Sequence, residues 1–345
     1  MIRMRSSITA VFCSLLLLAC DEVSPDTVLA QDGNRASSKR DAQDSKKSET
    51  APEEVSDEAK RFMRWKGEHE TEGRYQTSIA HYTDAAGRKV DLVAVVHIGD
   101  SGYYADLEKR FRSYDAVLYE LVAPKGTRPS QRDESRPSLI TRIQRLMKNS
   151  LGLVFQLDAI DYDAKNFVHA DLSPKQFLEK QEERGESMVT LMIRMMLAGM
   201  QNQKDAPPIT TFHILAGMND PNYLKFLFAQ QLEQVENLLA ALGGSNGEKS
   251  TIIGDRNAAA MAVLEEQLDE GAKSVAIFYG AAHMPDMEKR VRALGFEPAG
   301  VEWLTAWNVM LTDEERAKRA KLEAEKTARR EEILERRRKR AEAKK

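Results

Sequence analysis

The sequence predicts an α/β protein whose central sheet has βαβ connections, with a helical insertion in the middle of the chain and a charged helix at its C-terminal end. Three short, mostly apolar runs carry this prediction: LVAVV at 92–96, AVLYEL at 116–121 and SVAIFY at 274–279. Runs of this length, apolar on both faces, are typical of strands buried between helices. A helical pattern separates the first two runs, and a longer helical region separates the second from the third.

The first 19 residues read as a lipoprotein signal peptide. Two arginines precede an apolar run over 8–18, which is too short to span a bilayer. The run ends in LLAC at Cys20, which resembles a bacterial lipobox with Cys20 as the lipidated residue. We expect a lipid-anchored protein of the cell envelope, on the periplasmic face of the inner or outer membrane or on the cell surface. An ordinary secretory signal is the alternative.

Two polar segments flank the main domain, which we expect over 59–312. Residues 20–58 contain no aromatic side chain and predict a disordered tether. Residues 313–345 hold 14 Lys and Arg against 9 Asp and Glu at helical spacings, which predicts a charged helical tail. The tail has two interpretations: contact with an anionic lipid or envelope polymer, or a solvated helix.

Within the domain, the first half follows a strand, helix, strand order. The alternating pattern RYQTSIAHY is typical of a strand, and a polar turn with a glycine follows it. The elements expected here are a strand over 74–82, a turn over 84–88, a strand over 89–97, a helix over 103–114 and a strand over 116–121.

The second half begins with helical patterns, which we interpret as an insertion covering about 138–245. They lie at 138–149, 174–184, 186–203 and 220–242. The α/β pattern then resumes with a helix after Asp255, a strand over 274–279, a helix to Leu294 and a closing strand over 301–309.

Composition excludes several classes of protein. The chain has 345 residues, 42% of them hydrophobic and 30% charged, and no run approaches the roughly 20 apolar residues of a spanning helix. Two cysteines exclude a disulfide scaffold and a cysteine-rich zinc site. A net charge of −3 excludes a generally basic nucleic-acid binder, so we expect no nucleic-acid partner.

Polar side chains follow the predicted buried strands. His97 and His283 each come after an apolar run, Glu120 ends another, and Arg256 and Asn257 begin a helix. Because ligands bind at the carboxyl ends of strands in open α/β sheets, neighbouring strands would bring these residues together. Two imidazoles and a carboxylate suit a divalent metal, or a general base with its orienting partner.

Three segments resemble the TraB/PrgY/GumN family, which is related to the Tiki proteins and more remotely to the erythromycin-esterase/ChaN-like fold. They are VVHIGDSGYYADLEKRF, GDRNAAAMAVLEEQL and VAIFYGAAHMPDMEKRVRALGFEP. The family pattern is a pair of GxxH motifs with a Glu and an Arg. The second motif is intact from Gly280 to His283, whereas the first has Ala94 where glycine is usual.

The resemblance implies a membrane-anchored, metal-dependent hydrolase acting on peptides or proteins. It assigns His97 and His283 as metal ligands, Glu120 as ligand or base, and Arg256 with Asn257 to the catalytic set. The metal would be divalent manganese, cobalt or zinc. A metal-free hydrolase, in which a histidine activates water and Glu120 orients it, is one alternative. A non-catalytic lipoprotein that binds a metal, haem or peptide is another.

Other polar residues have two interpretations. Asp100 is either the N-cap of the helix after it or a partner of the site. His169 and Asp171 are either ligands or residues that precede the helix beginning near Pro174. His69, His81 and His213 have no partner that the pattern identifies.

Overall fold

The computed structural model describes residues 61–69, 72–129, 151–185, 220, 222–229, 250–318 and single residues between 320 and 331. The expected signal peptide with Cys20, the tether, the helices over 138–149 and 186–203 and most of the helix over 220–242 lie outside the described residues. Residues 222–229 are helical.

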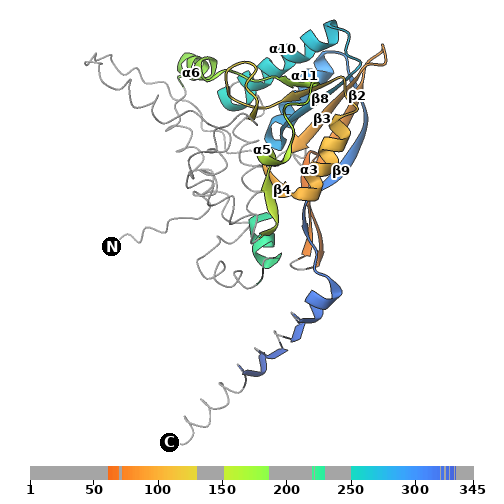
Figure 1. The fold of residues 1–345 in the computed structure, drawn as a ribbon, viewed down its shortest axis with the longest axis vertical. Coiled ribbons are helices and arrows are strands. Elements are labelled where there is room, and N and C mark those ends of the chain that lie inside the picture. Colours follow the sequence, from red (N-terminus) through yellow and green to blue (C-terminus); the bar gives the residue numbers. More distant parts are fainter. Residues whose placement is uncertain are drawn as a thin grey trace, which may run out of the picture.

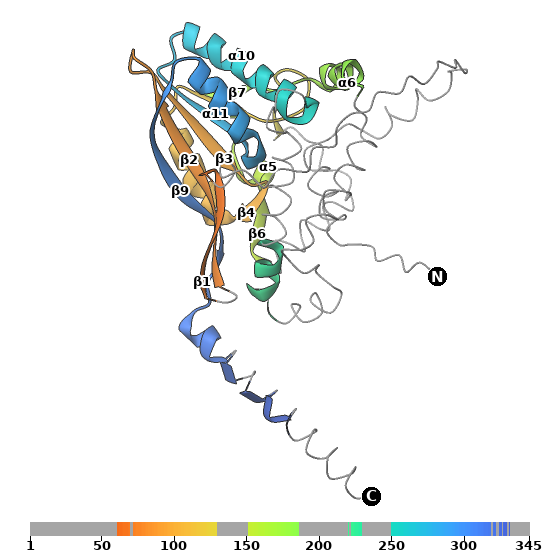
Figure 2. The ribbon, with the colours of Figure 1, turned by 180° about the vertical axis from the view of Figure 1, so that it is seen from behind.

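The described chain has an α/β fold around a seven-stranded mixed sheet (Figures 1 and 2). The strand order is β1-β2-β3-β8-β5-β7, and β9 pairs with β2. The four strands from β3 to β7 in this order are parallel, and β2 is antiparallel to its neighbours. The strands are β1 (Met63–His69), β2 (Glu72–Thr83), β3 (Lys89–Val95), β5 (Ala116–Tyr119), β7 (Phe167–His169), β8 (Ser274–Gly280) and β9 (Glu297–Val309).

Helices cover both faces of this sheet. Helix α3 (Ser101–Phe111) connects β3 to β5 on one face, while α10 (Arg256–Asp269) and α11 (Met284–Ala293) lie together on the other (Figures 1 and 2). The three apolar runs of the sequence are therefore buried on both sides, as predicted. Helix α6 (Pro174–Glu183) confirms the helix expected over 174–184, and Ser173 caps it with Gln176 in a capping box.

Two expectations about the elements are wrong. The strand expected over 89–97 stops at Val95, and β4 (Ile98–Asp100) starts a small second sheet with β6 (Leu153–Phe155). The region 138–245 is not all helical, because it holds β6, the short helix α5 (Gln156–Ala159) and β7 of the main sheet. Strands of three residues are too short to show a period of two, so the sequence pattern could not reveal them.

The closing strand ties the two ends of the domain together. It begins at Glu297, four residues before the expected Val301, and runs beside β2 as far as Val309. Strand β1 was not predicted, and it pairs with the first half of β2. The described residues that follow Thr312 are mostly exposed and mainly helical, and they lead away from the domain (Figure 1). Among the described residues, no helix has the length and apolar character needed to cross a membrane.

The centre of the core is aromatic, and this gives a first prediction. The Phe278 ring on β8 is fully buried, with its centroid 4.7 Å from that of Phe111. Phe278→Ala should lower the free energy of unfolding by about 3–5 kcal/mol, because the cavity it leaves cannot fully collapse. Urea unfolding followed by circular dichroism measures this change. The control is Leu178→Ala, at a side chain 48% exposed, which should change stability by less than about 0.5 kcal/mol. Equal effects would contradict the described core.

Candidate functional site

Three of the predicted site residues meet at the carboxyl ends of neighbouring parallel strands. Strand β8 lies between β3 and β5, so the residues after all three strands share one edge of the sheet. A Cβ atom built on Gly280 would lie 3.4 Å from Glu120 Oε2, 3.5 Å from His97 Nε2 and 3.8 Å from His283 Cδ2. The expectation that the two histidines converge with Glu120 is therefore confirmed.

The two histidine motifs are not equivalent in the sheet. The ladder pairs Gly280 with Val95, and it pairs Ala94 with Tyr279. Ala94 is buried within β3, where its carbonyl accepts a hydrogen bond from the Tyr103 hydroxyl. The small residue that matters for the site is Gly280, because the hydrogen of its Cα faces the space between the three side chains.

Arg256 joins Glu120 to a residue that the sequence left ambiguous. Its Nη2 donates to Glu120 Oε1 at 2.7 Å and to Asp171 Oδ2 at 2.6 Å, and its Nε donates to Asp171 at 3.1 Å. All three side chains are almost completely buried. The guanidinium is thus engaged by two carboxylates, and its role here is to hold Glu120. Asp171 does not cap α6, since Ser173 does.

The charges of this cluster depend on one another. Burial alone would raise the pKa of Glu120, but Arg256, the nearby histidines and the Gly280 N–H, which donates to Oε2 at 2.7 Å, hold that pKa well below its ordinary value. Burial acts in the opposite sense on Arg256, and Asp171 and Glu120 together raise the Arg256 pKa above its usual range. Glu120 is therefore an ionised carboxylate at neutral pH.

His283 is held by Asn257 and faces Glu120. Its Nδ1 lies 2.6 Å from Asn257 Oδ1, and Asn257 Nδ2 donates to Asp286 Oδ2 at 2.7 Å. Its Nε2 lies 3.5 Å from Glu120 Oε1. Burial lowers the pKa of His283 to about 4, which outweighs the opposing effect of Glu120. His283 is therefore neutral at neutral pH.

His97 is held in the same way by a residue that the sequence analysis missed. Its Nδ1 lies 3.0 Å from Gln156 Oε1, and Gln156 Nε2 donates to the Tyr162 hydroxyl at 2.9 Å. The Gln156 backbone N–H also donates to the His97 carbonyl at 2.9 Å. Each histidine is thus oriented at Nδ1 by a carboxamide oxygen, and His97, which is half-buried, is the more accessible of the two.

Two residues with open interpretations do not join this cluster. His169 Nε2 lies 2.6 Å from the Leu121 carbonyl oxygen, so it satisfies backbone beside β5. Asp100 occupies the N-cap position of α3 without a side-chain cap bond. Its carboxylate instead accepts from Lys225 Nζ at 2.5 Å and from the Asn308 N–H at 2.7 Å.

One of the remaining histidines has its partner outside this cluster. His81 pairs with Asp91 across β2 and β3, with 2.9 Å between Nδ1 and Oδ1. His69 ends β1, and His213 lies outside the described residues.

The described residues do not form a complete metal centre. In the described ranges, no three His, Cys, Asp or Glu side chains are grouped so that they could hold a metal ion together. Both oxygens of Glu120 accept strong hydrogen bonds, from Arg256 and from the Gly280 N–H. The metal that the resemblance implies stays a prediction.

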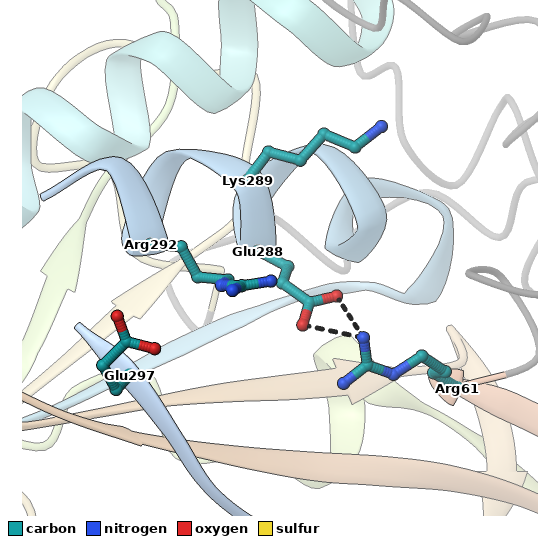
Figure 3. A pocket seen from close by; sticks show the side chains of 5 residues that line it. All are labelled: Arg61, Glu288, Lys289, Arg292 and Glu297. Atoms are coloured by element: carbon teal, nitrogen blue, oxygen red, sulfur yellow. Dashed lines mark hydrogen bonds and ion pairs between the residues drawn. The ribbon is translucent and has the colours of Figure 1, made fainter. Parts of the chain in front are cut away.

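A separate surface cavity lies along α11, away from these residues. It is lined by charged side chains, and Arg61 contacts both oxygens of the buried Glu288, at 3.0 and 3.2 Å (Figure 3). None of the residues that line it belongs to the histidine cluster; they are Arg61, Glu288, Lys289, Arg292 and Glu297.

Comparison of the chain with family models, curated proteins and solved structures finds no match in any of the three. The assignment to the TraB/PrgY/GumN family therefore stays a prediction.

Arg256→Met tests the buried charge cluster. The change leaves Glu120 and Asp171 without their cation, so we expect a loss of about 3–5 kcal/mol in the free energy of unfolding at neutral pH. In the native protein the pKa of Glu120 is lower than in the unfolded chain. Ionised Glu120 therefore stabilises the fold at pH values above its pKa in the unfolded chain, and this stabilisation is lost as the pH falls through its pKa in the folded protein. Without Arg256, burial raises that pKa and Glu120 folds protonated. The difference between variant and native protein should therefore narrow as pH falls to about 4.

Urea unfolding at several pH values measures this difference. The control is Arg110→Met, which breaks partly exposed pairs with Asp106 and Glu302 and should cost at most about 1 kcal/mol. A pH-independent loss in Arg256→Met would show that the described ion pairs do not set its stability.

Proposed function

We propose that the chain is an envelope-anchored hydrolase in which the cluster of His97, Glu120 and His283 activates water against a peptide or ester carbonyl. The anchor is inferred from the leader and Cys20 alone. Contact of the C-terminal tail with anionic lipid or envelope polymer is a further proposal, based on its charge. The chemistry is inferred from one contact within the cluster.

That contact is the 3.5 Å approach of His283 Nε2 to Glu120 Oε1. Because His283 is neutral and its Nδ1 faces the Asn257 oxygen, Nδ1 carries the proton and Nε2 presents a lone pair. Glu120 is ionised, so Oε1 is also an acceptor. Two buried acceptors that face one another favour a hydrogen-bond donor or a cation between or beside them.

A water molecule bound there would have the environment of a hydrolytic nucleophile. It could donate one hydrogen bond to His283 Nε2 and another to Glu120. As its oxygen bonds to the substrate carbonyl carbon, its proton would pass to Nε2, and the imidazolium could then return that proton to the leaving group. Glu120, fixed by Arg256 and the Gly280 N–H, would stabilise the imidazolium.

A metal-dependent version is the second candidate, and two observations favour it. Histidines that bind metals usually donate their other ring N–H to a fixed oxygen, and both Nδ1 atoms here face carboxamide oxygens. The buried charges of Glu120, Asp171 and Arg256 sum to one negative charge, which a cation would neutralise. To hold such a cation, His97, His283 and Glu120 would have to come together more closely than they lie in the described arrangement, and the cation would supply a water of lowered pKa.

The hydrolysis experiment uses the purified full chain with a peptide library and a set of simple esters. We expect product from at least one class, and we expect His283→Gln to reduce kcat/KM by about 100-fold or more because the general base is removed. The control is His81→Gln, because His81 on β2 pairs with Asp91 and does not belong to the cluster. This variant should leave the rate of hydrolysis unchanged. No product from the native protein, or an equal rate in both variants, would overturn the proposal.

Gly280→Ala tests whether hydrolysis takes place in the space between the side chains of His97, Glu120 and His283. Gly280 has φ −52° and ψ 141°, which alanine adopts without strain, and the added methyl would make only close van der Waals contacts. It would occupy the space that water or a metal needs, so we expect near-native unfolding with a loss of hydrolysis of at least about tenfold. Gly102→Ala, where nothing lies within 4 Å, is the matched control. Full activity in Gly280→Ala would place the reaction elsewhere.

Metal content separates the two candidates. The full chain, supplied with manganese, cobalt and zinc and then dialysed, is compared by elemental analysis with the His97→Ala/His283→Ala double variant, whose fold is checked by circular dichroism. Near-stoichiometric metal in the native protein and none in the variant would support the metal-dependent version. Hydrolysis that persists without stoichiometric metal would support the metal-free one.

A further inference from the structure

The surface cavity along α11 carries more positive charge than its own carboxylates neutralise. Its volume is about 340 Å³, which lies in the range of pockets that bind small molecules. Three of the side chains that line it are cationic and two are carboxylates, so the lining carries one net positive charge. The cations are Arg61, Lys289 and Arg292, and the carboxylates are Glu288 and Glu297.

Glu288 is the buried carboxylate of this lining, and it is already paired. Arg61 Nη1 contacts both of its oxygens, at 3.0 and 3.2 Å, and the Tyr82 hydroxyl donates to Oε1 at 2.9 Å. The Glu288 side chain is 7% exposed, and Tyr82 is almost completely buried. Together these contacts fix the Arg61 guanidinium, so little of the Glu288 charge is left for a second cation.

The rest of the Arg61 guanidinium is available to a ligand. Within the described residues, the hydrogen bonds and ion pairs of its side chain all use Nη1, and that side chain is 47% exposed. The backbone is fixed as well, because the Arg61 carbonyl accepts from Ser78 Oγ at 2.9 Å. Nε and Nη2 are therefore donors on a side chain whose position is already set, which lowers the entropy cost of binding.

Arg292 supplies a second guanidinium from the last turn of α11, and no hydrogen bond or ion pair joins its side chain to another residue that the structure describes. Burial and the neighbouring Glu288 raise the pKa of Tyr82. Arg61 and Arg292 both oppose this rise, so the two guanidinium groups lie within electrostatic reach of one hydroxyl. In Figure 3 both side chains extend toward Glu288. Two like charges so placed favour an anion between them.

We propose that the cavity binds a small molecule by an oxyanion group, either a carboxylate or a phosphate, held between Arg61 and Arg292. The planar fork of guanidinium donors matches the paired oxygens of both groups. Glu297 adds a negative charge to the same lining, so a polyanion is disfavoured and a ligand with one oxyanion and a hydroxyl or ammonium group fits best. Binding here does not depend on hydrolysis at the histidine cluster.

The test is isothermal titration calorimetry of the purified full chain with inorganic phosphate and with acetate, at one ionic strength set by sodium chloride. We expect saturable binding of at least one of these probes. Tighter binding of phosphate would assign a phosphorylated ligand, and tighter binding of acetate would assign a carboxylate ligand. Because chloride is present throughout, a general attraction of anions to positive charge is already satisfied by the buffer.

Arg292→Met removes one guanidinium and leaves the pair of Arg61 with Glu288 intact. We expect the affinity for the tighter probe to fall by at least about tenfold, because charge-assisted hydrogen bonds are lost. The matched control is Arg112→Met, which removes an equal charge from an exposed arginine at the end of α3, outside the cavity. It should bind the probe as the native protein does.

Arg61→Met should also weaken binding, and its fold is checked by circular dichroism because it leaves the buried Glu288 without its cation. Arg292→Met decides the question even if that variant fails to fold. No saturable binding of either probe, or native affinity in Arg292→Met, would overturn the inference. Equal losses in Arg292→Met and Arg112→Met would also overturn it, because attraction by net charge would then explain the binding.

Discussion

Arg256 lies between Glu120 and Asp171, and all three side chains are withdrawn from water. The guanidinium joins the end of β5, the loop after β7 and the first turn of α10, so its two ion pairs fix three elements relative to one another. A π-helix over Thr251–Asp255 leads directly into Arg256. Such irregular turns are found frequently at functional sites, and this one places the arginine at the helix start. The position of Glu120, and with it the whole cluster, depends on this cation.

His97 and His283 are oriented by carboxamide oxygens and not by carboxylates, and this affects the charge of the cluster. A carboxylate behind an imidazole would favour the charged imidazolium, whereas a carboxamide oxygen fixes the ring and leaves it neutral. Gln156 and Asn257 therefore add no further negative charge next to Glu120 and Asp171. The edge of the sheet keeps the neutral imidazole of His283 beside the ionised carboxylate of Glu120, and this arrangement is able to take up a proton.

The sequence could predict the parts of the site that directly follow long apolar strands. Glu120 and His283 stand at or just beyond such runs, and the parallel pairing of β3, β8 and β5 then brings them together with His97. Gln156 could not be found in this way, because it follows a three-residue strand with no visible period. Asp286 lies in the first turn of α11, where an acidic residue is common for reasons unrelated to any site.

Features of the structure that depend on tertiary packing could not be predicted from local sequence patterns. The sheet register that pairs Gly280 with Val95 is set by packing across the whole sheet, so the likeness of the two histidine motifs in sequence did not show that they occupy different positions in the ladder. The partner of Arg256 was open for a similar reason, since Asp171 precedes a helix and reads equally well as part of its start.

The pairing of β2 with β9 has a consequence for how the domain is made. The second strand of the sheet pairs with residues 297–309, more than 200 residues further along the chain, and β3 pairs with β8 across a similar gap. Contacts so distant in sequence slow folding, because a large loop must close before they form. While the chain is being synthesised, β2 and β3 are therefore made long before β9 and β8, the strands with which they pair. During synthesis its apolar strands remain available to chaperones, and the site exists only when nearly the whole domain has emerged.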